Sequence, residues 1–132
     1  MNSDALTDFA NRYATAWSGQ NAASVADFFE EDGSLQINAG ATSVGRAAIA
    51  AAAQSFMTAF PNMVVSLDRV CQRGEGAIFE WTLTGVNTGP SGTGRPVRIS
   101  GYEEWQFGTN GLIGESQGHF DDADYRRQLS GK

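Results

Sequence analysis

Two stretches late in the chain decide the fold: RPVRISGYEEWQF at residues 95–107 and GLIGESQGHFD at residues 111–121. Polar and apolar residues alternate along both, and a period of two predicts β-strands with one side in a core. One side of the first strand carries Val97, Ile99, Gly101, Glu103, Trp105 and Phe107. The matching side of the second carries Ile113, Glu115, Gln117, His119 and Asp121. Carboxylates beside aromatic rings lose water, which raises their pKa towards the range useful for proton transfer. The two strands therefore predict a small pocket with ionisable groups.

The second half of the chain continues the strand pattern outward from these stretches. We expect strands near residues 63–72, 76–87, 95–107 and 111–121. Glycine-rich turns are predicted at residues 73–76 and 108–111, and a flexible loop at residues 88–94. A short tail at residues 124–129 predicts one helical turn. Four successive strands joined by short turns are typical of an antiparallel sheet.

The first half of the chain is predicted to be mainly helical. Apolar residues at helical spacing predict a first helix over residues 3–18, with Ser3 as its cap and Gly19 at its end. A second helix is expected from residue 22 to Gly33, followed by a short strand at 34–38. A third, alanine-rich helix is expected over residues 45–59, capped by Ser43 and stopped by Pro61. Helices followed by strands predict an α+β fold, with three N-terminal helices packed on one face of a curved, mostly antiparallel sheet.

Composition limits the class of protein. A length of 132 residues, with 41% hydrophobic and 18% charged residues, predicts a single globular domain over residues 1–132. No apolar run approaches the ~20 residues of a membrane span, and no signal peptide is visible, so we expect a cytoplasmic protein without a membrane partner. The net charge of −6 argues against nucleic acid. One cysteine and one histidine exclude an internal disulfide and argue against a zinc site.

The order of elements and several short motifs carry a family resemblance. The motifs are YATAW at 13–17, FFEEDG at 28–33, GRAAI at 45–49, WTLTG at 81–85, TGP at 88–90, GRPV at 94–97, and Asp121 followed by Gln128 and Leu129. Over nearly its whole length the chain resembles the SnoaL-like polyketide cyclases of the nuclear transport factor 2 superfamily. This resemblance implies a cone-shaped fold with an apolar pocket, chemistry without a cofactor or metal, and a homodimer joined through the outer face of the sheet.

The resemblance also implies roles for individual residues. SnoaL-like cyclases use an aspartate near the end of the last strand as acid and base, and Asp121 matches that position. Tyr13 matches the oxyanion-hole tyrosine of the related ketosteroid isomerases, and Glu103 falls near their protonated acid. Ile37 stands where the catalytic aspartate of those isomerases belongs, which disfavours their reaction. The strand that carries Gln and His in the known cyclases instead carries Glu103, Glu104 and Trp105 in this chain.

These observations lead to one functional hypothesis. Asp121 removes a proton next to a carbonyl of an apolar, polyketide-like or cyclic substrate. Tyr13, together with a protonated Glu103 or with His119, donates hydrogen bonds to the enolate oxygen. Cyclisation, isomerisation and dehydration all stay open. The substrate-binding side chains expected around this small apolar molecule are Trp17, Asn38, Phe56, Trp81 and Trp105.

Other interpretations of the same residues remain open. Asp121 is also suited to cap the turn that follows it. A bulge that shifts the strand by one residue would place Glu104 inside instead of Glu103. The whole chain could be a non-catalytic ligand-binding or dimerisation domain, or an epoxide hydrolase in which Asp121 activates a water held by Asn38. Convergence of Tyr13, Glu103, His119 and Asp121 on one cavity would favour an enzyme, and their separation would favour a binding domain.

Overall fold

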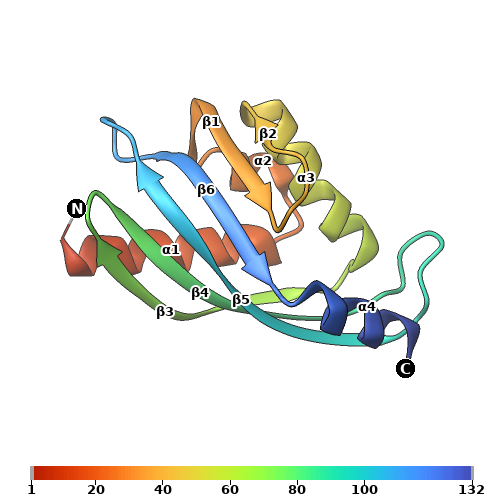
Figure 1. The fold of residues 1–132 in the computed structure, drawn as a ribbon. Helices are drawn as coiled ribbons and strands as arrows, with labels where there is room; N and C mark the ends of the chain where they lie inside the picture. Colours follow the sequence, from red (N-terminus) through yellow and green to blue (C-terminus); the bar gives the residue numbers. More distant parts are fainter. Residues whose placement is uncertain (1, 132) are drawn as a thin grey trace.

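The computed structural model describes residues 2–131 and has the predicted α+β architecture (Figure 1). One unclosed, curved sheet has the strand order β2-β1-β6-β5-β4-β3, and its pairs are antiparallel except for β1 with β6. Figure 1 shows α1 lying across the long strands β3, β4 and β5, while α3 lies beside β1 and β2. The elements in chain order are α1 (Ser3–Ser18), α2 (Ala22–Ala26), β1 (Phe29–Ile37), β2 (Ser43–Val44), α3 (Arg46–Ala59), β3 (Val64–Arg73), β4 (Gly76–Val86), β5 (Pro96–Phe107), β6 (Ile113–Phe120) and α4 (Asp122–Ser130).

The four long strands and the first and third helices lie within a few residues of their predicted positions, and the structure corrects the details. The second helix ends at Ala26 and not at Gly33, because Phe29 already begins β1, where it pairs with Ile113. The cap of α1 is Asn2 and not Ser3, since the Asn2 side chain accepts from the Ala5 N–H at 2.8 Å. The tail forms a helix of nine residues and not a single turn.

The start of α3 also differs from the prediction. Ser43 lies in the two-residue strand β2, where it pairs with Leu35, and therefore does not cap the helix. Gly45 takes the N-cap position, with no side chain to bond the first N–H groups. Its φ of 88° lies in a region that a residue with a Cβ rarely adopts, so glycine allows the chain to turn from β2 into α3.

The core between α1 and the sheet is built from aromatic rings. Tyr13 of α1 is fully buried and makes edge-to-face contacts with Phe79 of β4 and Trp105 of β5, with ring centroids 5.3 and 5.2 Å apart. Phe79 and Trp105 are stacked on each other, with centroids 4.9 Å apart. Large rings packed in fixed geometry stabilise α1 against the middle of the sheet. They also set the position of the polar group of Tyr13.

A β-bulge changes which side chains of β6 face the core. Ile113 pairs with Phe107 and Glu115 pairs with Gln106, so that Gly114 is one extra residue on β6. An extra residue reverses the alternation that follows it. The residues of β6 that face inward after the bulge are Ser116, Gly118 and Phe120.

A candidate site around Glu103

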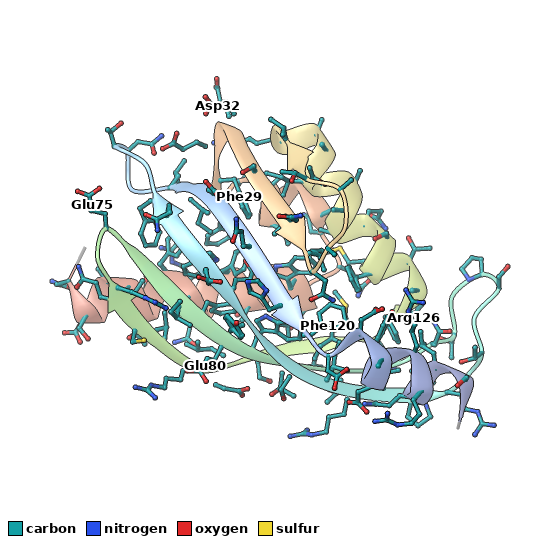
Figure 2. The ribbon with its side chains drawn as sticks, in the orientation of Figure 1. Phe29, Asp32, Glu75, Glu80, Phe120 and Arg126 are labelled. Carbon is teal, nitrogen blue, oxygen red and sulfur yellow. The ribbon has the colours of Figure 1, made fainter. Side chains whose placement is uncertain are left out.

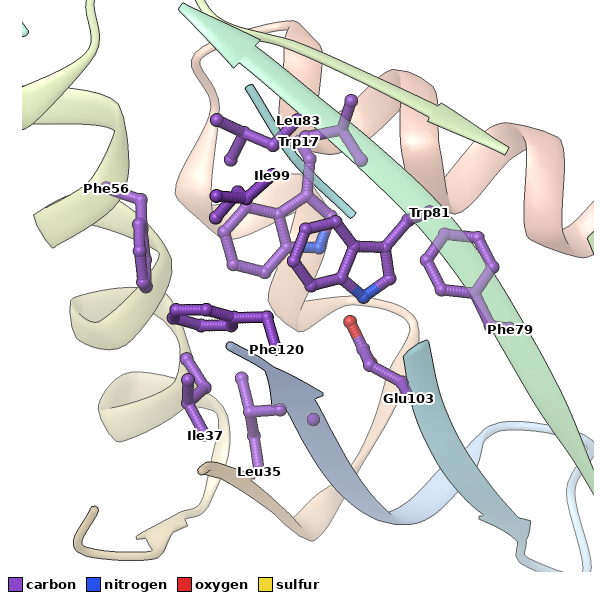
Figure 3. A pocket seen from close by; sticks show the side chains of 12 residues that line it. Trp17, Leu35, Ile37, Phe56, Phe79, Trp81, Leu83, Ile99, Glu103 and Phe120 are labelled. Carbon is purple, nitrogen blue, oxygen red and sulfur yellow. The ribbon is translucent and has the colours of Figure 1, made fainter. Parts of the chain in front are cut away.

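An apolar cavity opens between α1, α3 and the inner face of the sheet (Figure 3). Its volume of about 50 Å³ is room for about three to five water molecules at ~10–15 Å³ each. Of the lining residues within the described part of the chain, Glu103 alone is ionisable. The lining residues are Trp17, Leu35, Ile37, Phe56, Val65, Phe79, Trp81, Leu83, Ile99, Glu103, Gly118 and Phe120.

Glu103 is buried, as its place on β5 predicted. Its side of β5 also carries Ile99 and Trp105, and all three are less than a tenth exposed. Other carboxylates lie on the outside of the molecule, such as Asp32 and Glu75, whose side chains point away from the fold in Figure 2. Within residues 2–131, Glu103 is the one charged side chain that is buried. A buried carboxyl must be hydrogen-bonded or it destabilises the fold.

Three donors hold one oxygen of Glu103. Its Oε1 accepts from Tyr13 Oη at 3.0 Å, from Trp105 Nε1 at 2.9 Å and from Ser116 Oγ at 2.7 Å. The other oxygen, Oε2, has a longer contact of 3.3 Å with Tyr13 Oη. Ser116 reaches Glu103 because it pairs with Trp105 across β5 and β6. One carboxyl oxygen is thus held from three directions, while the side chain lines the cavity.

The surroundings of Glu103 change its acidity. Burial raises the pKa of Glu103 above its ordinary value of 4.5, and the donors of Trp105, Ser116 and Tyr13 offset part of this rise. Burial also raises the pKa of Tyr13 well above 10.0, and the nearby Glu103 charge adds to the rise. Tyr13 therefore remains a hydrogen-bond donor at neutral pH. Glu103 is a carboxyl that retains its proton to a higher pH than an exposed one.

The structure places the other predicted residues in three groups. Trp17, Phe56 and Trp81 line the cavity together with Glu103. Tyr13 and Trp105 lie behind the cavity wall, where both donate to Glu103. The last group lies away from the lining and comprises Asn38, His119 and Asp121.

The prediction that His119 and Asp121 face the pocket is wrong, because the bulge at Gly114 reverses the alternation of β6. His119 lies on the outer face of the sheet, half-exposed, with its Nε2 2.8 Å from Glu104 Oε1. Asp121 follows the strand and is exposed, and its Oδ1 accepts from the Asp124 N–H at 3.1 Å as the cap of α4. The capping interpretation of Asp121 describes its contacts, and its role as a base stays a prediction.

Asn38 has a structural contact at the end of β1. It adopts a left-handed conformation with φ of 51°, which asparagine tolerates better than most residues. Its Oδ1 accepts from the Phe120 N–H at 2.9 Å and ties β1 to β6. The side-chain oxygens of Asn38 and Asp121 thus both bind backbone N–H groups. This arrangement gives no support to a water held by Asn38 and activated by Asp121.

Sequence reasoning missed Ser116 as a partner of Glu103. Counting in twos from Ile113 puts Ser116 on the outer side, since the bulge is invisible to a regular alternation. The signal available was Gly114, because glycine inside a strand often marks a bulge.

Residues 2–131 contain neither a metal-binding group nor a helix that could span a membrane. No three histidine, cysteine or carboxylate side chains in this part of the chain lie together as a metal-binding group. None of its helices has the length and apolar character needed to cross a bilayer.

Solved structures with the same fold cover almost the whole chain. A ketosteroid isomerase-like protein of Catenulispora acidiphila, in complex with trimethylamine, matches with a TM-score of 0.82 at 20% identity, over 93% of this chain and 92% of that one. A protein of Jannaschia sp., provisionally described as a SnoaL-like polyketide cyclase, has a TM-score of 0.78 at 14% identity, over 100% and 98%. A phenazine biosynthesis-related protein of Pseudomonas aeruginosa has a TM-score of 0.76 at 14% identity, over 98% and 86%. Identities this low show the fold alone.

Sequence comparison identifies the family. None of the curated proteins compared with the chain matches it. The family model of the SnoaL-like domain matches residues 10–116, which hold the second half of α1, most of the cavity wall and the whole Glu103 cluster. The chain therefore belongs to the SnoaL-like domain family.

Proposed function

We propose that the protein is a cofactor-independent acid/base enzyme that acts on a small apolar compound with a carbonyl group, and that Glu103 transfers the proton. One observation carries the proposal: a single buried carboxyl lines an apolar cavity, with Oε1 fixed by three donors and Oε2 less engaged. Figure 3 shows the Glu103 side chain reaching from its strand towards the Trp81 indole. A fixed carboxyl with a raised pKa is a stronger base than an exposed one and is suited to take up and return a proton.

The chemistry follows from this placement. Ionised Glu103 accepts a proton at Oε2 from the carbon next to the carbonyl, so a C–H bond breaks and an O–H bond forms. The electron pair moves to the carbonyl oxygen as an enolate. Protonated Glu103 then returns the proton to the same or another carbon. Alternatively the enolate carbon attacks a second carbonyl of the molecule, a C–C bond forms as the C=O π bond opens, and the resulting alkoxide takes the proton from Glu103. Tyr13, Trp105 and Ser116 are positioning residues, since they touch Glu103 and lie behind the cavity.

The size of the cavity supports a small substrate. A cavity of about 50 Å³ is well below the ~300 Å³ at which ligand pockets usually begin, so even a compact ring requires the walls to move, and a molecule of several fused rings requires a much larger movement. The apolar lining favours hydrocarbon parts next to the carbonyl. Proton exchange or isomerisation of a compact ketone therefore fits the present walls better than closure of a long polyketide chain.

Deuterium uptake tests the proposal. Cyclopentanone in D₂O exchanges its hydrogens next to the carbonyl, and NMR follows the loss of their signal with wild-type protein and with two carboxyl-to-amide variants. We expect catalysis by wild type, a loss of about 10²–10⁴-fold in Glu103→Gln, and wild-type rates in Asp121→Asn. The opposite pattern, with loss only in Asp121→Asn, would move the base to Asp121. Absence of catalysis by wild type would reject the enzyme proposal.

A non-catalytic amine-binding site is the second candidate, because aromatic rings and a carboxylate together suit a cation. Trp17, Phe56 and Trp81 surround the cavity with Glu103, and no Lys or Arg of residues 2–131 lines it. The Catenulispora protein of the same fold is described in complex with trimethylamine. Calorimetry with trimethylammonium chloride tests this candidate. Binding that is lost in Glu103→Gln, from a protein without exchange activity, would favour it over the enzyme.

A further inference from the structure

Two of the three indole N–H groups in the chain have no hydrogen-bond acceptor within residues 2–131. Trp17 of α1 and Trp81 of β4 are only 7% and 9% exposed, and both line the cavity. Both Nε1 atoms are buried, and neither has an acceptor in hydrogen-bond geometry within residues 2–131. The Trp17 indole still lies near enough to the Tyr13 hydroxyl to oppose part of the rise in the pKa of Tyr13. The third indole, that of Trp105, donates to Glu103 at 2.9 Å. The two unpaired donors therefore lie on the same apolar cavity as the buried carboxyl.

Unpaired buried donors need a physical explanation, because burying an N–H without an acceptor is destabilising. Trp17 comes from α1 and Trp81 from β4, and both side chains line the cavity (Figure 3). The Trp81 indole nitrogen is directed to the side of the cavity on which Glu103 lies. A ligand that fills this cavity and carries an oxygen would supply the acceptor that residues 2–131 do not supply.

Neighbouring residues hold both indoles in place. Gly101 pairs with Trp81 across β4 and β5, and a Cβ at position 101 would lie 2.8 Å from Trp81 Cζ2 and would clash with the His119 carbonyl oxygen. The glycine thus leaves room for the Trp81 ring to lie over β5. Trp17 packs edge-to-face on Phe56 of α3, with centroids 6.2 Å apart. The two donors are therefore set before a ligand arrives.

We infer that the indole N–H groups of Trp17 and Trp81 bind the oxygen of the ligand and determine the specificity of the site for a carbonyl compound over a hydrocarbon of the same shape. The inference rests on the proposed function for the class of substrate. It assigns to these two tryptophans the contact with the oxygen, while Glu103 faces the neighbouring carbon. Such donors also stabilise the enolate, since hydrogen bonds strengthen as negative charge develops on the oxygen. An anionic ligand is disfavoured by the Glu103 carboxylate.

NMR of the ¹⁵N-labelled protein tests this inference without turnover. The chain has three indole N–H signals, which the variants Trp17→Phe and Trp81→Phe assign. The probes are cyclopentanone and methylenecyclopentane, which differ in the carbonyl oxygen. We expect cyclopentanone to move the Trp17 and Trp81 signals downfield, as new hydrogen bonds do. The hydrocarbon should not cause this shift. Trp105 serves as the internal reference because its N–H already has a partner.

Affinities give the matched comparison. The ratio of cyclopentanone to methylenecyclopentane affinity should fall about 2- to 10-fold in Trp17→Phe and in Trp81→Phe, the effect of one lost hydrogen bond. The control Phe56→Leu removes a ring that has no N–H. In this variant both affinities should change while their ratio stays the same. Equal indole responses to the two probes, including none to either, would overturn the inference. If Glu103→Gln leaves deuterium exchange intact while the indole shifts persist, only the proposed function fails. Catalysed exchange without indole shifts overturns the inference alone.

Discussion

Tyr13→Phe removes one atom, the Oη that donates to Glu103 at 3.0 and 3.3 Å, and keeps the ring contacts of the core. A hydrogen bond to an ionised acceptor stabilises by about 1.5–3 kcal/mol, and one to a neutral acceptor by about 0.5–1.5 kcal/mol. The lost donor also raises the pKa of Glu103 further, because that donor favours the charged form. The loss in free energy of unfolding should therefore grow with pH, from about 0.5–1.5 kcal/mol at the acidic end of a pH series, where Glu103 is neutral, to about 1.5–3 kcal/mol at the alkaline end, where it is ionised.

Urea denaturation at both ends of the pH series measures this difference. The control is Tyr102→Phe, because Tyr102 lies on the outer face of the sheet and is 41% exposed. Removing its hydroxyl should change the free energy of unfolding by no more than about 0.5 kcal/mol. A destabilisation by Tyr13→Phe that is the same at both pH values would show that the charge of Glu103 does not depend on this hydrogen bond. No destabilisation at either pH would refute the buried contact itself.

Four further results are expected. The folded-state pKa of Glu103 is raised above 4.5, so the stability that neutral Glu103 contributes to the fold is fully present below that value and is lost as the pH rises through the folded pKa. Urea titrations should therefore show Glu103→Gln gaining stability relative to wild type over that window, and a constant difference would contradict the shift. Asp121→Ala should lower the local stability of α4 by about 0.5–2 kcal/mol, measured by amide hydrogen exchange, while Asp121→Asn should retain the cap. Gly101→Ala should destabilise by about 1–3 kcal/mol and alter the fluorescence of Trp81, and an unchanged protein would refute the close contact. Light scattering should give twice the chain mass of 14.1 kDa, for a homodimer joined through the outer face of the sheet, and the mass of one chain would remove that expectation.

Local patterns were sufficient for the elements and for the burial of Glu103. Helical spacing of apolar residues in α1, and alternation in β4 and β5, depend on which side of a single element meets a core, and this repeats within a few residues. The β5 pattern placed Glu103 beside Ile99 and Trp105 correctly because β4 and β5 pair without interruption. The boundary between α2 and β1 was missed, because β1 is fixed by its parallel pairing with β6, which lies some 80 residues later in the chain.

What the sequence determined by itself is therefore the set of long elements, the buried carboxyl on β5 and most of the aromatic lining of a pocket. Only the tertiary structure decided which polar groups meet there. Tyr13 and Glu103 are 90 residues apart, and no periodicity links them. The bulge at Gly114 turned Ser116 inward and His119 outward, since one unpaired residue reverses every side chain after it. Strand pairing and helix packing act over long sequence distances, and they bring Tyr13, Ser116 and Trp105 to one oxygen of Glu103.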